Sequence, residues 1–239
     1  MSPYRFPICV IGQGAFLTRA VKTLLENKLT PIVLLTSKHK IPLPSNIEVV
    51  AQGNPNDILE NSTKVQKSTT ILLANNPHII SQKVLSDYRS VYNLHNSIVE
   101  LNRGLAQNCA IDSMLKNHKI FGTSLQKVTP GFDIDASPTL HIERFKLSKN
   151  ACFEEIMIGV GKSWLVTLDQ VLIPHLLGER QLRELELGLG PYVDEQSLNV
   201  EVYNNGKYSK SLKDIGLGNF SPHFPKTEFL VKSFQNYWT

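Results

Sequence analysis

Four short apolar segments in the first hundred residues constrain the fold of this chain more than any other feature. They are rich in Val, Ile and Leu and have the length of buried strands: 7–11 (PICVI), 31–36 (PIVLLT), 69–74 (TTILLA) and 91–95 (VYNLH). Helical apolar spacing over 15–27, and a helix expected over 81–88, separate them. A further short strand is expected at 47–50, inside an irregular stretch rich in Pro and Asn over 42–56. Strands that alternate with helices predict an α/β fold, a Rossmann-like and mainly parallel twisted sheet flanked by helices.

The pattern changes in the second half of the chain. We expect a helix over 104–116, and then strands over 120–128 and 138–145. One long helix is predicted over 151–177, with Gly178 as its stop. Asn, Gly, Ser and Tyr dominate after about residue 190, and the segment LNVEVYNNGKYSKSL predicts a β-hairpin that turns at Asn204-Asn205-Gly206. The chain therefore divides into a main domain over 1–180 and a small C-terminal lobe or linker over 181–239.

Composition narrows the class of protein. The chain has 239 residues, of which 41% are hydrophobic and 19% charged, so it can bury a sizeable core. The net charge of +4 is not gathered into long runs, which argues against a nucleic-acid partner. No stretch of about 18 apolar residues indicates a membrane span. Cys9, Cys109 and Cys152 form neither a CxxC pair nor a readable disulfide framework. We expect a soluble cytoplasmic protein with no metal, no nucleic-acid partner and no membrane partner.

The first candidate site is the turn Gly12-Gln13-Gly14, which follows the first strand. Glycines at this place let a backbone approach a phosphate at a helix N-terminus. The dinucleotide fingerprint is incomplete, because Leu17 stands at the third glycine position and Thr36-Ser37-Lys38 at the expected acidic position. Three interpretations stay open here: a structural tight turn, a turn that faces some other substrate, and a nicotinamide-nucleotide site.

The second candidate site is the end of the fourth strand, Asn93-Leu94-His95. Residues two apart in a strand point to the same side, so Asn93 and His95 project together. They do so at the carboxyl edge of a parallel sheet, where open α/β sheets hold ligands. The alternative is a buried histidine with a purely structural role. Because an amide and an imidazole face one way here, both interpretations stay open.

The segment YNLHNSIVELNRG (92–104) resembles a signature of the folate-dependent formyltransferases, an Asn-x-His followed by a turn and an Arg-Gly. GTSLQKVTPGFDIDAS (122–137) resembles that family's second signature. On this match Asp133 occupies the catalytic aspartate position, and Asp135 falls where the family usually has glycine. Segments 77–85 and 172–179 are also similar to the family. The resemblance covers roughly residues 7–180 and implies a formyltransferase catalytic domain there.

The resemblance also implies roles for particular residues. Asn93, His95 and Asp133 would be catalytic, and 10-formyltetrahydrofolate would be the co-substrate. Residues expected to contact the folate lie in two loops: Asn76, Pro77, His78, Ile79 and Ile80 in one, and Thr129, Pro130 and Gly131 in the other. For the substrate we expect contacts from Gly12, Gln13, Gly14 and Arg103. The family's chemistry requires no metal, and the histidines show no HExxH spacing.

The amine acceptor is expected to be a small molecule. The chain is short and has no strongly basic tail, which argues against transfer RNA. Two classes of acceptor remain: a nucleotide-linked amino sugar, and an amino acid or aminoacyl carrier of a peptide synthetase. The chain could act as a homodimer or as part of a fusion to further domains. Two other functions stay open: a non-catalytic formyltransferase-like binding module, and an NAD(P)-binding oxidoreductase.

Overall fold

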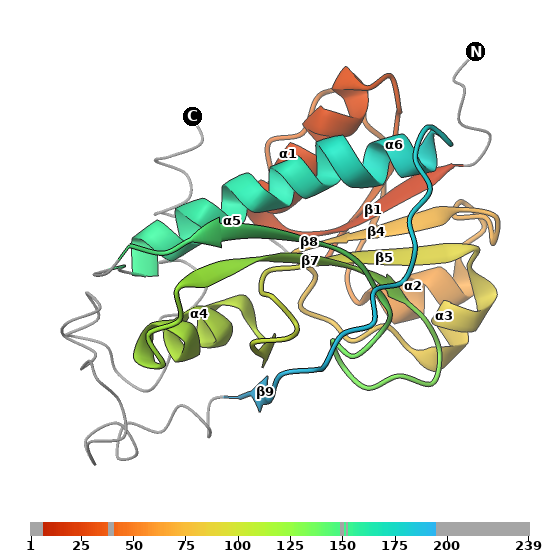
Figure 1. The fold of residues 1–239 in the computed structure, drawn as a ribbon. Helices are drawn as coiled ribbons and strands as arrows, with labels where there is room; N and C mark the ends of the chain where they lie inside the picture. Colours follow the sequence, from red (N-terminus) through yellow and green to blue (C-terminus); the bar gives the residue numbers. More distant parts are fainter. Residues whose placement is uncertain (1–6, 38–40, 149–150, 152, 195–239) are drawn as a thin grey trace.

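A seven-stranded sheet forms the centre of the protein, seen here in a computed structural model that describes residues 7–37, 41–148, 151 and 153–194. The strand order is β3-β2-β1-β4-β5-β7-β8 (Figure 1). The first five strands in this order pair in parallel: β3 (Val49–Gln52), β2 (Ile32–Leu35), β1 (Ile8–Gly12), β4 (Thr70–Ala74) and β5 (Ser90–His95). The two remaining strands, β7 (Ile120–Val128) and β8 (Thr139–Lys146), pair antiparallel. The predicted mainly parallel α/β fold is confirmed.

Helices cover both faces of this sheet. The helices α1 (Gly14–Glu26) and α5 (Phe153–Thr167) lie over one face. On the other side Figure 1 shows α2 (Pro55–Asn61), α3 (Gln82–Asp87) and α4 (Ala106–Leu115). Alternate strand residues therefore enter different cores. One core contains Val10, Leu72, Leu94, Leu17 and Trp164, and the opposite one contains Cys9, Ile71, Val91, Leu59 and Val84.

The long helix expected over 151–177 is one continuous element with a change of geometry inside it. After α5 the chain passes through a π-helical turn, η1 (Leu168–Leu172), into α6 (Ile173–Leu176). Pro174 lacks a backbone N–H, so the regular ladder cannot continue unchanged there. Gly178 follows with φ +79° and its N–H donates to His175 O, as expected of a helix stop.

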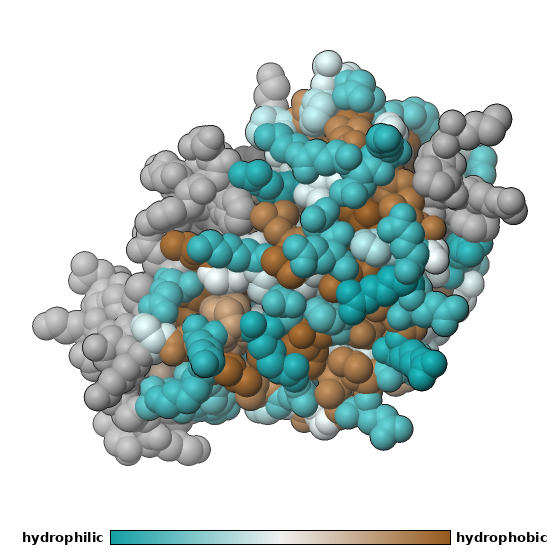
Figure 2. Space-filling model, turned by 45° about the horizontal axis from the view of Figure 1, so that its top comes forward, coloured by the Kyte–Doolittle hydropathy of each residue, from teal (hydrophilic) through white to brown (hydrophobic). Residues whose placement is uncertain are grey.

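The stretch Glu155–Leu176 is apolar and long enough to cross a membrane by length and composition alone. However, 61% of it is buried inside the protein, where it packs on the sheet. On the face turned toward the viewer in Figure 2, apolar areas are interleaved with hydrophilic ones. The burial identifies this stretch as a core helix of the α/β domain.

Two parts of the chain differ from the sequence prediction. The short strand expected at 47–50 is β3, which begins two residues later, and the helix α2 that follows was not predicted. Its start has a clear signal, since the Asn54 side chain accepts from the Asn56 N–H and Pro55 occupies the first turn. Residues 181–193 lie in the segment predicted as a small C-terminal lobe or linker, and within it Leu185 N donates to Thr139 O of β8. The predicted hairpin over 198–212 lies outside the described residues.

The Gly12-Gln13-Gly14 turn is built into the sheet. Gly12 lies at the end of β1, beside Ala74 of β4. A Cβ on Gly12 would lie 1.8 Å from Ala74 O, so only glycine fits there. Gln13 N donates to the same oxygen, and Gly14 begins α1 with φ +65°. These contacts give the turn a structural role in joining β1 to α1.

We predict that Gly12→Ala destabilises the protein. The added methyl group meets backbone rather than a movable side chain, so the loss should exceed the roughly 1–3 kcal/mol of ordinary overpacking in a core. Urea unfolding followed by circular dichroism measures it. Gly188→Ala is the matched control, because a Cβ there has nothing within 4 Å. Equal stability of the two variants would contradict the structural role of Gly12.

Candidate functional site

His95 is the last residue of β5 and is the centre of the candidate site. Its side chain is 6% exposed, and its Nδ1 lies 3.5 Å from Oδ1 of Asp135, an ion-pair distance. The other ring nitrogen, Nε2, is buried and has no hydrogen-bond partner among the residues that the structure describes. Buried polar atoms are normally paired, and unpaired ones often mark functional sites. One ring nitrogen of the imidazole thus faces a carboxylate, while the other has no partner among the described residues.

The carboxylate beside His95 belongs to Asp135, whereas the sequence pattern assigned this place to Asp133. The Asp133 side chain lies in an exposed part of the β7–β8 loop. Its carbonyl accepts from Ala136 N, and Asp135 sits inside this turn with φ +53°. Aspartate tolerates this left-handed conformation better than most residues. Asp135 is also nearer than Asp133 in sequence to Thr139, where β8 begins. The turn directs the Asp135 carboxylate toward His95, at the carboxyl end of β5.

Contacts from two segments of the chain hold Asp135 in this position. Gly104 N donates to its Oδ2 over 3.1 Å, so each carboxylate oxygen has its own partner. From β7, Gln126 donates its Nε2 to the carbonyl oxygens of Asp135 and Ser137, at 3.0 and 3.3 Å. Gln126 is itself fully buried. The carboxylate is therefore fixed by both backbone and side-chain contacts.

Asn93 lies two residues before His95 on the same strand and faces the same side of the sheet. In the sheet register it stands opposite Gln126 of β7 and Leu73 of β4. Its side chain is half-buried, and within the described part of the chain no group pairs with its amide. An amide and an imidazole nitrogen on one face of β5 thus both lack a hydrogen-bond partner among the described residues.

The first predicted folate loop, 76–80, is ordered by polar side chains. Asn76 closes a turn on His78, accepting its N–H at 3.2 Å and donating to its carbonyl at 2.6 Å. Asn56 of α2 donates to Ile79 O and accepts from Ser81 N, both at 2.8 Å. Ile79 is 66% exposed at the tip, whereas the Ile80 side chain belongs to the core. Ile79 is therefore the apolar side chain that this loop presents outward.

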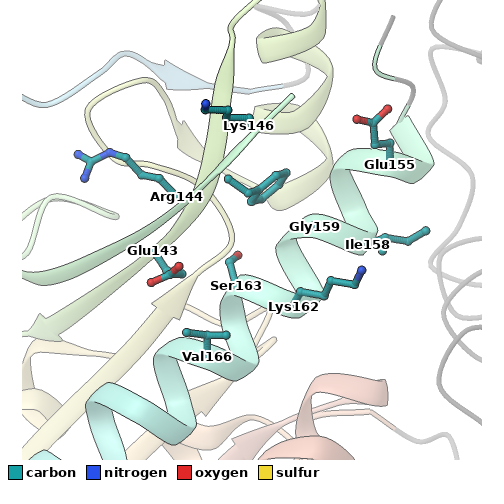
Figure 3. A pocket seen from close by; sticks show the side chains of 10 residues that line it. Glu143, Arg144, Lys146, Glu155, Ile158, Gly159, Lys162, Ser163 and Val166 are labelled. Carbon is teal, nitrogen blue, oxygen red and sulfur yellow. The ribbon is translucent and has the colours of Figure 1, made fainter. Parts of the chain in front are cut away.

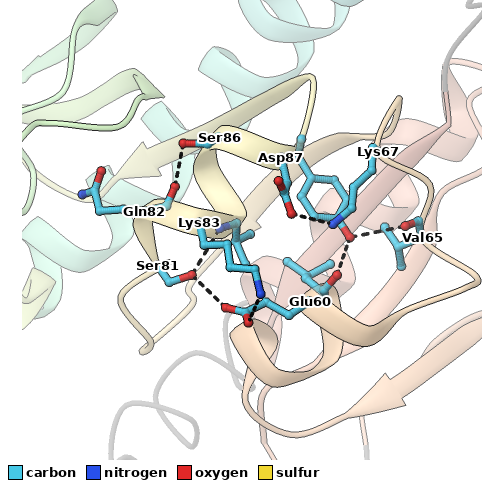
Figure 4. Close-up of polar contacts among 11 residues, drawn as sticks. Glu60, Val65, Lys67, Ser81, Gln82, Lys83, Ser86 and Asp87 are labelled. Carbon is cyan, nitrogen blue, oxygen red and sulfur yellow. Dashed lines mark hydrogen bonds and ion pairs between the residues drawn. The ribbon is translucent and has the colours of Figure 1, made fainter.

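Polar contacts between α2 and α3, the helices on either side of the loop 76–80 in the sequence, also help to hold this loop (Figure 4). Ser81 caps α3, accepting from Val84 N, and the Lys83 ammonium lies 2.8 Å from the Glu60 carboxylate. Hydrogen bonding to Lys83 lowers the pKa of Glu60. Because both groups are solvent-exposed, the pair contributes little to stability and mainly fixes orientation.

The second predicted folate loop meets the first one. Gly131 N donates to Oε1 of Gln82, the first residue of α3, over 2.8 Å. Thr129 N donates to Ser137 Oγ, while the Thr129 hydroxyl is buried and has no partner in the described residues. Pro130 and Gly131 are exposed. The two loops expected to contact a folate are therefore joined in space through Gln82.

Arg103, expected to bind substrate, makes two side-chain contacts within the protein. Its Nε donates to Gly190 O at 2.9 Å and its Nη1 to Ile134 O at 3.1 Å. The turn before it is held by a buried network that the sequence did not reveal. In this network Asn102 Nδ2 contacts Cys109 O, Asp112 Oδ2 and Ser113 Oγ, and Ser97 Oγ donates to the Asn102 oxygens. Arg103 thus directly follows a turn that this network fixes, and it lies beside Asp135.

Thiol and metal chemistry find little support in the described residues. Cys9 and Cys109 are buried, and burial raises the pKa of Cys9 to about 12 and that of Cys109 even further. Protonated, inaccessible thiols are poor nucleophiles. Throughout the described ranges, no group of three or more His, Cys, Asp or Glu side chains is placed to hold a metal ion.

A groove of about 570 Å³ lies elsewhere, between β8 and α5 (Figure 3). Charged side chains of both signs line it, including Glu143, Arg144 and Lys162. Phe145 and Gly159 pack together in its floor, where a Cβ on Gly159 would lie 2.2 Å from the Phe145 ring. The α5 side of the sheet is opposite the α3 side that His95 faces, so this groove is separate from the candidate site.

Comparisons with known proteins support this geometry at the level of the fold. No family model and no curated protein matches the sequence. The N-formyltransferase of Helicobacter canadensis, solved with folinic acid and dTDP-3-aminofucose, superposes with a TM-score of 0.61 at 12% identity, over 82% of this chain and 73% of that one. Phosphoribosylglycinamide formyltransferase of Anaplasma phagocytophilum gives 0.61 at 17% identity, over 79% and 99%. The 4-N formyltransferase of Francisella tularensis gives 0.62 at 13%, over 81% and 78%. The chain therefore has the formyltransferase fold.

Proposed function

We propose that this protein is a folate-dependent N-formyltransferase, which moves a formyl group from 10-formyltetrahydrofolate to a primary amine of a small molecule. The observation that carries the proposal is the His95–Asp135 pair, with Nε2 of His95 unpartnered beside the open amide of Asn93. This set lies at the carboxyl end of β5, at the edge where open α/β sheets bind ligands. Proteins with this fold include formyltransferases of amino sugars and of phosphoribosylglycinamide.

In the proposed reaction the acceptor nitrogen forms a bond to the formyl carbon, and the carbonyl oxygen becomes an oxyanion. Protonated His95 donates from Nε2, and Asn93 donates from its amide, to that oxygen. Loss of one such donor typically costs about 2.7–4 kcal/mol of transition-state stabilisation. The bond from the formyl carbon to N10 of the folate then breaks. Its electron pair stays on N10, which takes up a proton, while the acceptor nitrogen releases one.

Asp135 serves this chemistry through His95. Its Oδ1 faces Nδ1, so the ring orientation that presents Nε2 is fixed. Because Gly104 N occupies the other carboxylate oxygen, Asp135 cannot turn away easily. In this proposal the catalytic set is Asn93, His95 and Asp135.

The folate is proposed to bind between the two joined loops. The Asn56 and Gln82 contacts fix the backbone of 76–80 relative to 129–131. Ile79 offers an exposed apolar side chain next to this place, and the unpartnered Thr129 hydroxyl offers a polar group. Ligand sites typically combine apolar walls with a few polar groups in this way. The acceptor is a nucleotide-linked amino sugar, an amino acid or an aminoacyl carrier.

Asp135→Asn should lower kcat by about 10²- to 10⁴-fold, the range for loss of a general acid–base partner. Asp133→Asn is the matched control, since its carboxylate is exposed, and should leave kcat within about twofold. Formyl transfer to a panel of amino sugars and amino acids, followed by mass spectrometry, measures both. The reverse order of effects would reassign the carboxylate to Asp133.

Reduced folate should raise the melting temperature, because a ligand that binds only the folded state stabilises it. At a concentration of 100 times Kd the expected gain is about 2.7 kcal/mol. Thermal unfolding with 5-formyltetrahydrofolate measures this gain, with NADPH as the comparison ligand. Protection by NADPH alone would favour an oxidoreductase, while folate binding without formyl transfer to any amine would indicate a non-catalytic binding module.

A further inference from the structure

The segment 188–193, here called the strap, is bound directly to the turn that leads into the site. Gly190 N donates to Val99 O at 2.7 Å, and Arg103 N donates to Pro191 O at 2.9 Å. Within the strap, β9 (Tyr192–Val193) pairs in parallel with β6 (Arg103–Gly104). From α4, Asn108 also donates to Val193 O. The strap is thus part of the domain surface that adjoins Asp135.

Two glycines allow this close backbone contact. A Cβ on Gly190 would lie 2.5 Å from Leu101 C and 2.7 Å from Asn102 N. Gly104 has φ +122°, and a Cβ on it would lie 2.6 Å from Val193 O. In contrast, a Cβ on Gly188 meets nothing within 4 Å. The strap therefore packs directly against the backbone of residues 101–104, and no side chain fits at the positions of the two glycines.

Arg103 connects the strap to the loop that carries Asp135. Its Nε binds Gly190 O of the strap, and its Nη1 binds Ile134 O, one peptide before Asp135. The next residue, Gly104, donates its N–H to the Asp135 carboxylate. Two consecutive residues of one short strand therefore hold both the backbone and the side chain at Asp135.

We propose that Arg103 is a positioning residue, which holds Asp135 against His95 and couples that contact to the strap. The inference rests on the proposed formyl transfer and replaces the expectation that Arg103 binds the acceptor. Both contacts of Arg103 are donated to carbonyl oxygens, at two different nitrogens of a planar group. Lysine has a single ammonium in place of this fork, so it can replace the pair of contacts only in part.

Arg103→Ala tests the proposal by the division of its effect between kcat and KM. We expect kcat to fall about 10- to 100-fold, because misplacement of a catalytic group by about 1 Å has effects of this size. The acceptor KM should stay within about twofold. Arg103→Lys should recover part of the lost activity, and added ethylguanidinium should partly restore Arg103→Ala. Arg183→Ala, an exposed arginine just upstream of the strap, is the control and should behave as wild type.

Gly190→Ala tests the coupling from the strap side, with Gly188→Ala as its control. The methyl group should displace the strap, pull on Arg103 and lower kcat in the same way. The ¹⁵N resonances of the His95 ring, measured without substrate, report its contact with Asp135 independently of turnover. They should change in Arg103→Ala and Gly190→Ala but not in the two controls.

Two results would overturn the inference. A rise in acceptor KM with unchanged kcat in Arg103→Ala would make Arg103 a substrate-binding residue. Unchanged His95 resonances in both Arg103→Ala and Gly190→Ala would show that neither residue positions Asp135. If the wild-type protein transfers no formyl group to any amine, the proposed function fails, while the resonances still decide whether Arg103 sets the His95–Asp135 contact.

Discussion

The contact between His95 and Asp135 is the interaction on which the candidate site depends. The two residues are distant in the chain, and the sheet brings them together because β5 and β7 are neighbours. β7 runs antiparallel to β5 and ends at Val128 beside Val91, near the start of β5, so the β7–β8 loop has to fold back for Asp135 to reach His95 at the other end of the strand. A buried imidazole with one nitrogen paired and the other open results from this topology. The chemistry of the site therefore depends on the position of His95 at the end of β5, the last parallel strand of the sheet.

The loops around His95 are held by side chains that come from other elements. Asn56, Gln82, Gln126 and Arg103 each donate to or accept from backbone groups of these loops. Such contacts fix loop geometry without regular secondary structure, and each is worth roughly 0.5–1.5 kcal/mol in net stability. Their larger effect is on position, since catalysis is sensitive to small displacements of the reacting groups.

The sequence predicted the sheet well because its strands are short, buried and apolar on both faces. A short apolar run such as TTILLA, within an alternating α/β pattern, predicts a buried strand. The strand β7 was predicted with its observed bounds. Asn93 and His95 were identified by the same logic, since their place at a strand end follows from the period of a strand. Helix α2 was missed because its capping signal, Asn54-Pro55, was included in an irregular stretch.

The loop residues could not be predicted as reliably. The resemblance put Asp133 at the catalytic aspartate position and Asp135 at a glycine position, whereas in the structure Asp135, in a left-handed turn, is the carboxylate that faces His95. Arg103 has the chemistry of an anion binder in the sequence, and in the structure its Nε and Nη1 donate to Gly190 O and Ile134 O. Such outcomes depend on backbone turns and on long-range contacts, which local residue patterns do not encode.

A crystal structure of the protein with bound 5-formyltetrahydrofolate would test the central claim most directly. The account predicts that the pterin lies between the loops 76–80 and 129–131. It also predicts that the one-carbon end of the folate lies within reach of Nε2 of His95 and the amide of Asn93. A folate bound away from β5, or a His95 ring turned from Asp135 in the complex, would contradict it.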